Sequence, residues 1–127
     1  MTVQLNHTIV NANDKRESAE FLADVLGLPP PKPYGHFLVV EADNDVSLDF
    51  ADDHGEVHPQ HYAFLVSEEQ FDEIFGRIQE RPIPYYADPA GTREGEINTR
   101  DGGRGCYFAD PAGHWLEILT RPYGSGG

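Results

Sequence analysis

The chain has 127 residues, with 22 Asp and Glu against 9 Lys and Arg, which gives a formal net charge of −13 at pH 7. This length is enough for one domain with its own core, and the acidic charge argues against nucleic acid and anionic membrane surfaces as partners. A single cysteine rules out an internal disulfide framework, and no apolar run is long enough to span a membrane. We therefore expect a soluble, cytoplasmic protein.

The first half of the chain is predicted to contain a strand, a helix and two further strands. Residues 3–10 form the first strand, and residues 15–26 carry apolar side chains at helical spacing. A glycine and three consecutive prolines follow and end the helix. Residues 35–42 and 46–51 are the next two strands, and Asp49 lies in the second of them.

A polar linker over residues 52–60 separates this half from a second one that begins in the same way. Residues 61–66 form a strand. Ser67, with Gln70 three residues later, has the pattern of a capping box, and an amphipathic helix follows to about residue 80.

The remainder of the second half is predicted to be a short strand, a long loop and a hairpin. The strand covers residues 83–87, and the loop covers residues 88–105 and is rich in glycine and charge. A loop of this length in a compact domain is usually functional or disordered. Residues 104–109 and 114–120 are the hairpin strands, joined by Asp-Pro-Ala-Gly, which is typical turn chemistry. We expect the final Gly-Ser-Gly-Gly to be a flexible tail.

Glu117 is an unusual residue in the last strand of the hairpin. Alternation places its carboxylate on one face with Trp115 and Leu119, within an otherwise apolar run. A buried carboxylate without a partner is costly, so a cation or hydrogen-bond donors should face it.

The two halves place the same kinds of polar residue at matching positions. His7 and His61 each begin a strand, and each follows a side-chain amide; Asp49 and Glu117 lie at matching positions in a later strand. Two histidines and two carboxylates are the ligands that a divalent metal ion requires. The sequence therefore predicts an α+β fold of two βαβββ modules, about 1–52 and 60–121 within one domain, that form a half-barrel metal cleft.

The chain resembles the vicinal oxygen chelate superfamily, which includes glyoxalases, extradiol dioxygenases, fosfomycin-modifying transferases, epimerases and bleomycin-resistance proteins. The resemblance is carried by Asn-His-Thr at residues 6–8, Gln-His-Tyr at 60–62 and Asp-Pro-Ala-Gly-His-Trp-Leu-Glu at 110–117, and it extends over essentially the whole chain.

This resemblance implies a set of site residues. His7, His61 and Glu117 correspond to the three metal ligands, and Asp49 lies where glyoxalases have a fourth, usually a longer Glu. Tyr107, ten residues before Glu117, corresponds to a tyrosine that hydrogen-bonds the metal-bound substrate oxygen. In the proton-transfer interpretation, Glu117 or Asp49 also acts as the base. The metal is Fe(II), Ni, Zn, Mn or Co, and the sequence does not choose among them.

The resemblance also implies what the protein does. We expect a homodimeric enzyme whose small-molecule substrate chelates the metal through adjacent oxygens. The reaction is either that of a glyoxalase-like lyase or isomerase, favoured by Asp49, or that of an extradiol-type dioxygenase, favoured by Tyr107. The competing class is a bleomycin-resistance-like protein that sequesters a small molecule without turnover.

Overall fold

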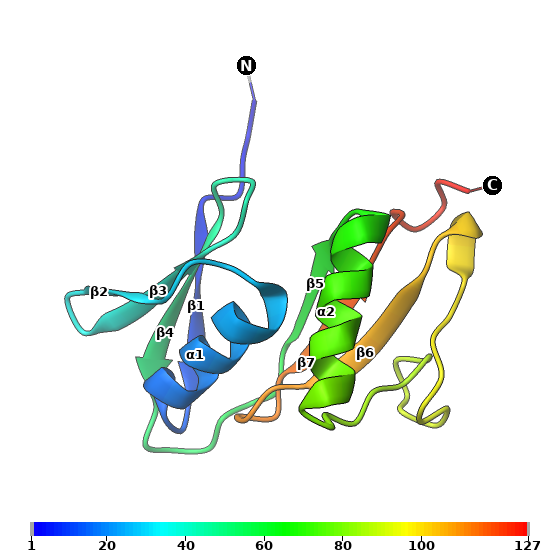
Figure 1. The fold of residues 1–127 in the computed structure, drawn as a ribbon. Coiled ribbons are helices and arrows are strands. Elements are labelled where there is room, and N and C mark those ends of the chain that lie inside the picture. The colour runs from blue at the N-terminus through cyan, green and yellow to red at the C-terminus, as the bar shows by residue number, and fades with distance from the viewer. Residues whose placement is uncertain (1, 127) are drawn as a thin grey trace. The chain divides into compact units, whose positions relative to one another are not determined.

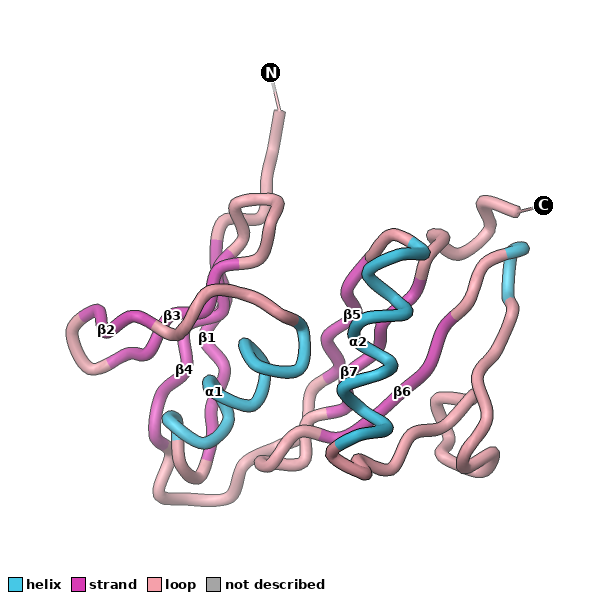
Figure 2. Tube along the Cα trace, in the orientation of Figure 1, coloured by secondary structure: helices cyan, strands magenta, loops and turns pink. Residues whose placement is uncertain are grey.

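The structure is a computed structural model that describes residues 2–126 and divides into two compact units, Met1–His58 and Pro59–Gly127. Figures 1 and 2 show the elements of each unit. The first unit contains β1 (His7–Ala12), α1 (Lys15–Leu26), β2 (Lys32–Tyr34), β3 (Phe37–Glu41) and β4 (Ser47–Asp52). The second contains β5 (His61–Leu65), α2 (Glu68–Glu80), a 3₁₀ turn (Arg100–Gly102), β6 (Gly105–Ala109) and β7 (Trp115–Leu119).

The sheet of the first unit has the strand order β1-β4-β3-β2. β1 runs parallel to β4, and the other two pairs are antiparallel. Helix α1 lies across one face of this sheet (Figure 1) and contacts β1, β3 and β4. Alternate strand residues such as Val10, Val40 and Phe50 are buried on that side, so His7 and Asp49 belong to the opposite face.

Both ends of α1 are capped, and the sequence predicts the glycine at its C-terminal end. Asp14 accepts hydrogen bonds from the backbone N–H groups of Arg16 and Glu17, and Gly27 ends the helix with a φ of 72°. This left-handed conformation favours glycine because it lacks a Cβ. The helix covers the predicted residues, 15–26.

In the second unit the sheet order is β5-β7-β6, with β7 parallel to β5 and antiparallel to β6. Helix α2 begins with the predicted capping box, in which Ser67 and Gln70 bond each other's backbone N–H groups. The helix lies over one face of the sheet (Figure 1), and both it and the strands bury apolar side chains. These are Phe71, Ile74 and Ile78 from the helix and Phe108, Leu116 and Ile118 from the strands.

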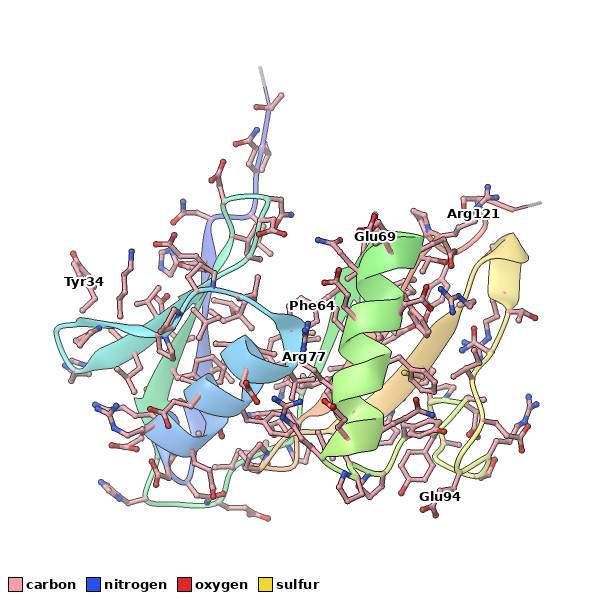
Figure 3. All side chains as sticks on the ribbon, in the orientation of Figure 1. Tyr34, Phe64, Glu69, Arg77, Glu94 and Arg121 are labelled. Carbon is pink, nitrogen blue, oxygen red and sulfur yellow. The ribbon has the colours of Figure 1, made fainter. Side chains whose placement is uncertain are left out.

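The α+β prediction is confirmed, but three of the strand predictions differ from the structure. The strand expected over 83–87 is reduced to isolated bridges from Tyr86 to Glu94 and to Tyr107. Two prolines, Pro82 and Pro84, lack the N–H groups that a continuous ladder needs. The sequence prediction also missed β2, which lies directly after the proline run, and Tyr34 extends from it into solvent (Figure 3).

The first strand begins at His7 rather than at residue 3 because its partner begins at Ser47, which pairs with His7. The residues before it are exposed, including Val3 and Leu5. Among residues 2–126, neither α-helix combines the length and the apolar composition that crossing a membrane requires.

The turn between β6 and β7 is held by two side chains. Asp110 accepts hydrogen bonds at Oδ1 from the N–H groups of Ala112 and His114, at 3.0 and 2.7 Å. The ring of His114 is buried, and its Nδ1 accepts the N–H of Gln60 at 3.0 Å, which links the turn to the start of β5. His114 therefore has a structural contact on the side away from Glu117.

We predict that His114→Ala lowers the free energy of unfolding by about 2–3 kcal/mol, because it removes buried volume and leaves the Gln60 N–H without its acceptor. Urea denaturation measures the change. His54→Ala, in the exposed linker, is the control and should stay within about 0.5 kcal/mol of the parent. Equal stabilities of the two variants would contradict a structural role for His114.

Candidate metal centre

Glu117 lies at the centre of the face of the second sheet that is not covered by α2. It pairs with Ala63 on β5 and with Tyr107 on β6, so the three side chains form one row across the sheet. The Glu117 side chain is only 1% exposed. The small Ala63 leaves room beside the carboxylate for a side chain from the neighbouring row.

His61 fills that room. It pairs with Trp115, two residues before Glu117, and reaches diagonally so that its Nε2 lies 3.1 Å from Oε1 of Glu117. Its other ring nitrogen, Nδ1, lies 2.9 Å from the backbone carbonyl oxygen of Trp115. A carbonyl oxygen can only accept a hydrogen bond, so Nδ1 carries the proton.

This arrangement fits a metal ion. With Nδ1 protonated, a neutral His61 presents the Nε2 lone pair to a carboxylate oxygen that is also an acceptor when ionised. Two lone pairs that face each other need a proton or a cation between them. A histidine that donates Nδ1–H to a backbone carbonyl and keeps Nε2 basic has the orientation found at metal sites.

The spacing of the two atoms agrees with the same interpretation. Neighbouring ligands of an octahedral ion, each bound at about 2.1 Å, lie about 3.0 Å apart. The separation between Nε2 of His61 and Oε1 of Glu117 is 3.1 Å.

The second oxygen of Glu117 receives a chain of hydrogen bonds. The Tyr123 hydroxyl lies 2.5 Å from Oε2, the Tyr107 hydroxyl lies 2.9 Å from that of Tyr123, and Nη1 of Arg100 lies 3.0 Å from that of Tyr107. Because arginine can only donate and a carboxylate can only accept, the direction of every bond is fixed. Arg100 donates to Tyr107, Tyr107 to Tyr123, and Tyr123 to Glu117.

The pKa shifts of two residues are consistent with this series of hydrogen bonds. Burial, followed by the hydrogen bonds to Glu117 and Tyr107, raises the pKa of Tyr123, so the hydroxyl keeps its proton at neutral pH. The hydrogen bond to Tyr107 raises the pKa of Arg100, which stays charged. The hydrogen-bonded series therefore begins at the guanidinium cation of Arg100 and ends at the carboxylate of Glu117.

A cleft of about 560 Å³ opens beside these groups, in the second unit. Its walls are largely aromatic: the Tyr107 ring stacks against Trp115, with centroids 6.1 Å apart, and against His61, at 5.9 Å. The cleft is lined by His61, Pro89, Arg100, Tyr107, Trp115 and Tyr123. Within residues 2–126, the indole Nε1 of Trp115 is buried without a hydrogen-bond partner.

The first unit repeats the backbone arrangement with different side chains. His7 pairs with Ser47, two residues before Asp49, just as His61 pairs with Trp115. Nδ1 of His7 lies 2.7 Å from the side-chain oxygen of Asn6, which leaves Nε2 as the basic nitrogen. Asp49 accepts a hydrogen bond from Ser47 at 3.1 Å.

The structure thus brings His61 and Glu117 together and links Tyr107 to them through Tyr123. His7 and Asp49 lie in the first unit. Over residues 2–126, no three or more His, Cys, Asp or Glu side chains gather closely enough to hold a metal by themselves. The single cysteine, Cys106, is buried, and burial raises its thiol pKa to about 12.

The sequence analysis missed the parts of the site contributed by Tyr123 and Arg100. Tyr123 adjoins the predicted flexible tail, and nothing in the local pattern marks it as functional. Its segment is instead held in place, because the N–H groups of Gly124 and Gly126 donate to the carboxylate of Asp101. The amide residues that precede the two histidines also act differently. The side chain of Asn6 contacts Nδ1 of His7, whereas Nδ1 of His61 is contacted by the backbone carbonyl of Trp115 and not by the side chain of Gln60.

Comparison with known proteins gives similar enzymes. The solved structure of oxidase ChaP-H2 is 66% identical, with a TM-score of 0.97 over 100% of both chains. Glutathione transferase FosA from Serratia marcescens is 29% identical, over 93% of this chain and 81% of that protein. Metallothiol transferase FosB from Lysinibacillus sphaericus is 26% identical, over 94% and 84%.

These relatives confirm the prediction of a metal-dependent enzyme at the level of the superfamily, whose homologues use divalent metals. The sequence model of the glyoxalase/bleomycin resistance protein/dioxygenase superfamily matches residues 4–118. That match includes both histidine-led strands and the hairpin that carries Glu117. The chain therefore belongs to the glyoxalase/bleomycin resistance protein/dioxygenase superfamily.

Proposed function

We propose that this chain is a cytoplasmic, metal-dependent oxidase of the dioxygenase type, acting on a small molecule that presents two adjacent oxygens to the metal. The observation that carries the metal centre is the contact between Nε2 of His61 and the buried Glu117, with Nδ1 of His61 already committed to a carbonyl. The 66% identity to oxidase ChaP-H2 supports oxidation over isomerisation. Dioxygen is the oxidant in this proposal.

The ligand set that we propose is His7, His61 and Glu117, with Asp49 as a fourth candidate. Two histidines and one carboxylate form the set used by non-haem Fe(II) enzymes, so we propose Fe(II) as the native metal. Asp49 has a shorter side chain than Glu117 and already accepts a hydrogen bond from Ser47, which supports a secondary role for it.

When bound, the metal would supply Lewis acidity toward the substrate's adjacent oxygens and a site for dioxygen. The chain's own residues bind and orient the substrate. Tyr107 and Trp115 provide an aromatic wall against which a flat substrate can stack. Arg100 lines the same cleft and favours an anionic substrate oxygen. We propose Glu117 as the base that accepts the substrate's proton.

We predict that His61→Ala and Glu117→Gln each abolish retention of Fe(II), because the first removes the ligand nitrogen and the second removes the negative charge of the carboxylate. Elemental mass spectrometry of protein purified without oxygen measures the metal per chain. The parent and the control His54→Ala should retain about one ion per chain, and circular dichroism should show that all variants fold.

Retention of metal by both site variants would refute the ligand assignment. A parent protein that takes up no metal, even after reloading with Fe(II), would remove the enzyme proposal and leave a binding protein that sequesters its ligand. Tight binding of a small molecule without any product would support that alternative.

We also propose a homodimer in which each metal site draws on two chains. Mixing inactive His7→Ala and His61→Ala chains tests this proposal. If His7 of one chain serves the site of its partner, each mixed dimer has one site with both histidines and one site with neither. Each mixed dimer should therefore regain one metal ion, together with oxygen uptake.

If each chain instead builds its site alone, every site in the mixture lacks one histidine and neither metal nor activity returns. Size-exclusion chromatography with light scattering gives the oligomeric state of the same samples. A monomer at high concentration would overturn the dimer proposal directly.

A further inference from the structure

The segment that follows β7 returns to the site through a tyrosine. Tyr123 is 59% exposed overall, yet its hydroxyl lies 2.5 Å from Oε2 of Glu117, a side chain that is only 1% exposed. Hydrophobic burial therefore does not explain why the residue lies there. Its hydroxyl is the group that makes the buried contact.

A set of polar contacts holds this segment, residues 121–126, against the loop before β6. The N–H of Gly124 donates to Oδ2 of Asp101 at 3.0 Å, and that of Gly126 donates to Oδ1 at 3.3 Å. Arg121, which projects from the segment in Figure 3, donates to the carbonyl of Ser125 at 3.1 Å.

The packing of the segment is equally specific. A Cβ on Gly126 would lie 2.0 Å from the backbone oxygen of Asp101, so only glycine fits there. Asp101 itself has a φ of 55°, a conformation that Asp adopts more readily than most residues. Residues 121–126 thus pack against the loop that contains Asp101. These contacts, which lie outside the cleft, place Tyr123 beside Glu117.

The consequence for Glu117 is that its two oxygens have different partners. Oε1 faces His61, and Oε2 accepts the Tyr123 hydroxyl, which in turn accepts from Tyr107. A carboxylate with one oxygen held by a donor is left with the other oxygen for a metal ion. Groups that hydrogen-bond a ligand in this way fix its orientation and raise affinity for the metal.

We propose that Tyr123 is a positioning residue, which the segment 121–126 and Asp101 hold so that Glu117 offers a single oxygen to the metal. This inference rests on the proposed role of Glu117 as a metal ligand. It assigns to the end of the chain a function in tuning the metal centre.

Titration of the metal-free protein with Co(II) tests the proposal, because visible absorption reports the coordination of this ion and needs no substrate. We expect Tyr123→Phe to weaken Co(II) binding by about 10-fold to 100-fold and to alter the absorption bands, since Oε2 becomes free to coordinate. The matched control is Tyr34→Phe, on the exposed β2, which should bind like the parent.

Asp101→Gly tests the anchor, because glycine tolerates the positive φ while removing both acceptors. We expect weaker Co(II) binding in this variant. If Asp101 acts only through Tyr123, the double variant Asp101→Gly/Tyr123→Phe should bind no more weakly than Tyr123→Phe alone. Independent, additive losses would contradict a shared role and overturn the proposed anchor.

Glu117→Gln in the same titration separates the two proposals. Loss of Co(II) in Glu117→Gln, together with parent-like affinity and spectrum in Tyr123→Phe, would overturn the Tyr123 inference and keep the proposed metal centre. Retention of Co(II) in Glu117→Gln would overturn both. Weakened, spectrally altered binding in Tyr123→Phe with loss in Glu117→Gln is the result that we expect.

Discussion

The structure of the second unit depends on the burial of one carboxylate. Removing a charged group from water costs several kcal/mol unless partners replace the lost hydration. Glu117 lies in the central strand of its sheet and is almost wholly buried, so the polar side chains that contact it must compensate for the lost hydration. The imidazole of His61 faces one oxygen, and a directed chain of hydroxyls that begins at the cation of Arg100 faces the other.

The two units share the same strand register but place different polar side chains on it. In each unit a histidine at the start of a strand pairs with the residue two positions before an acid on the parallel strand. The neighbours then differ. Glu117 lies between Ala63 and Tyr107 on the neighbouring strands. Asp49 lies between Ile9 and Val39, and its shorter side chain accepts a hydrogen bond from Ser47 on its own strand. The aromatic cleft lies in the second unit because Tyr107 and Trp115 occur there.

The helices and the face on which Glu117 lies could be predicted because local rules determine them. Helix periodicity and caps need only a short window of sequence, and strand alternation places Glu117 on a defined face. Strand limits were less predictable, since β1 begins where its distant partner Ser47 begins. Tyr123 could not be found from its neighbours, because its position depends on Asp101, which is remote along the chain.

The seating of the last residues also has a practical consequence for handling the protein. The N–H of Gly126 is bonded to Asp101, and there is no space for a side chain at this position. An affinity tag or fusion partner attached at this end would pull on the same backbone that carries Tyr123. The opposite end begins with exposed residues such as Val3 and Leu5, which precede the first strand. Tags placed there would not load the segment that carries Tyr123, so the choice of terminus is itself a variable in any affinity measurement.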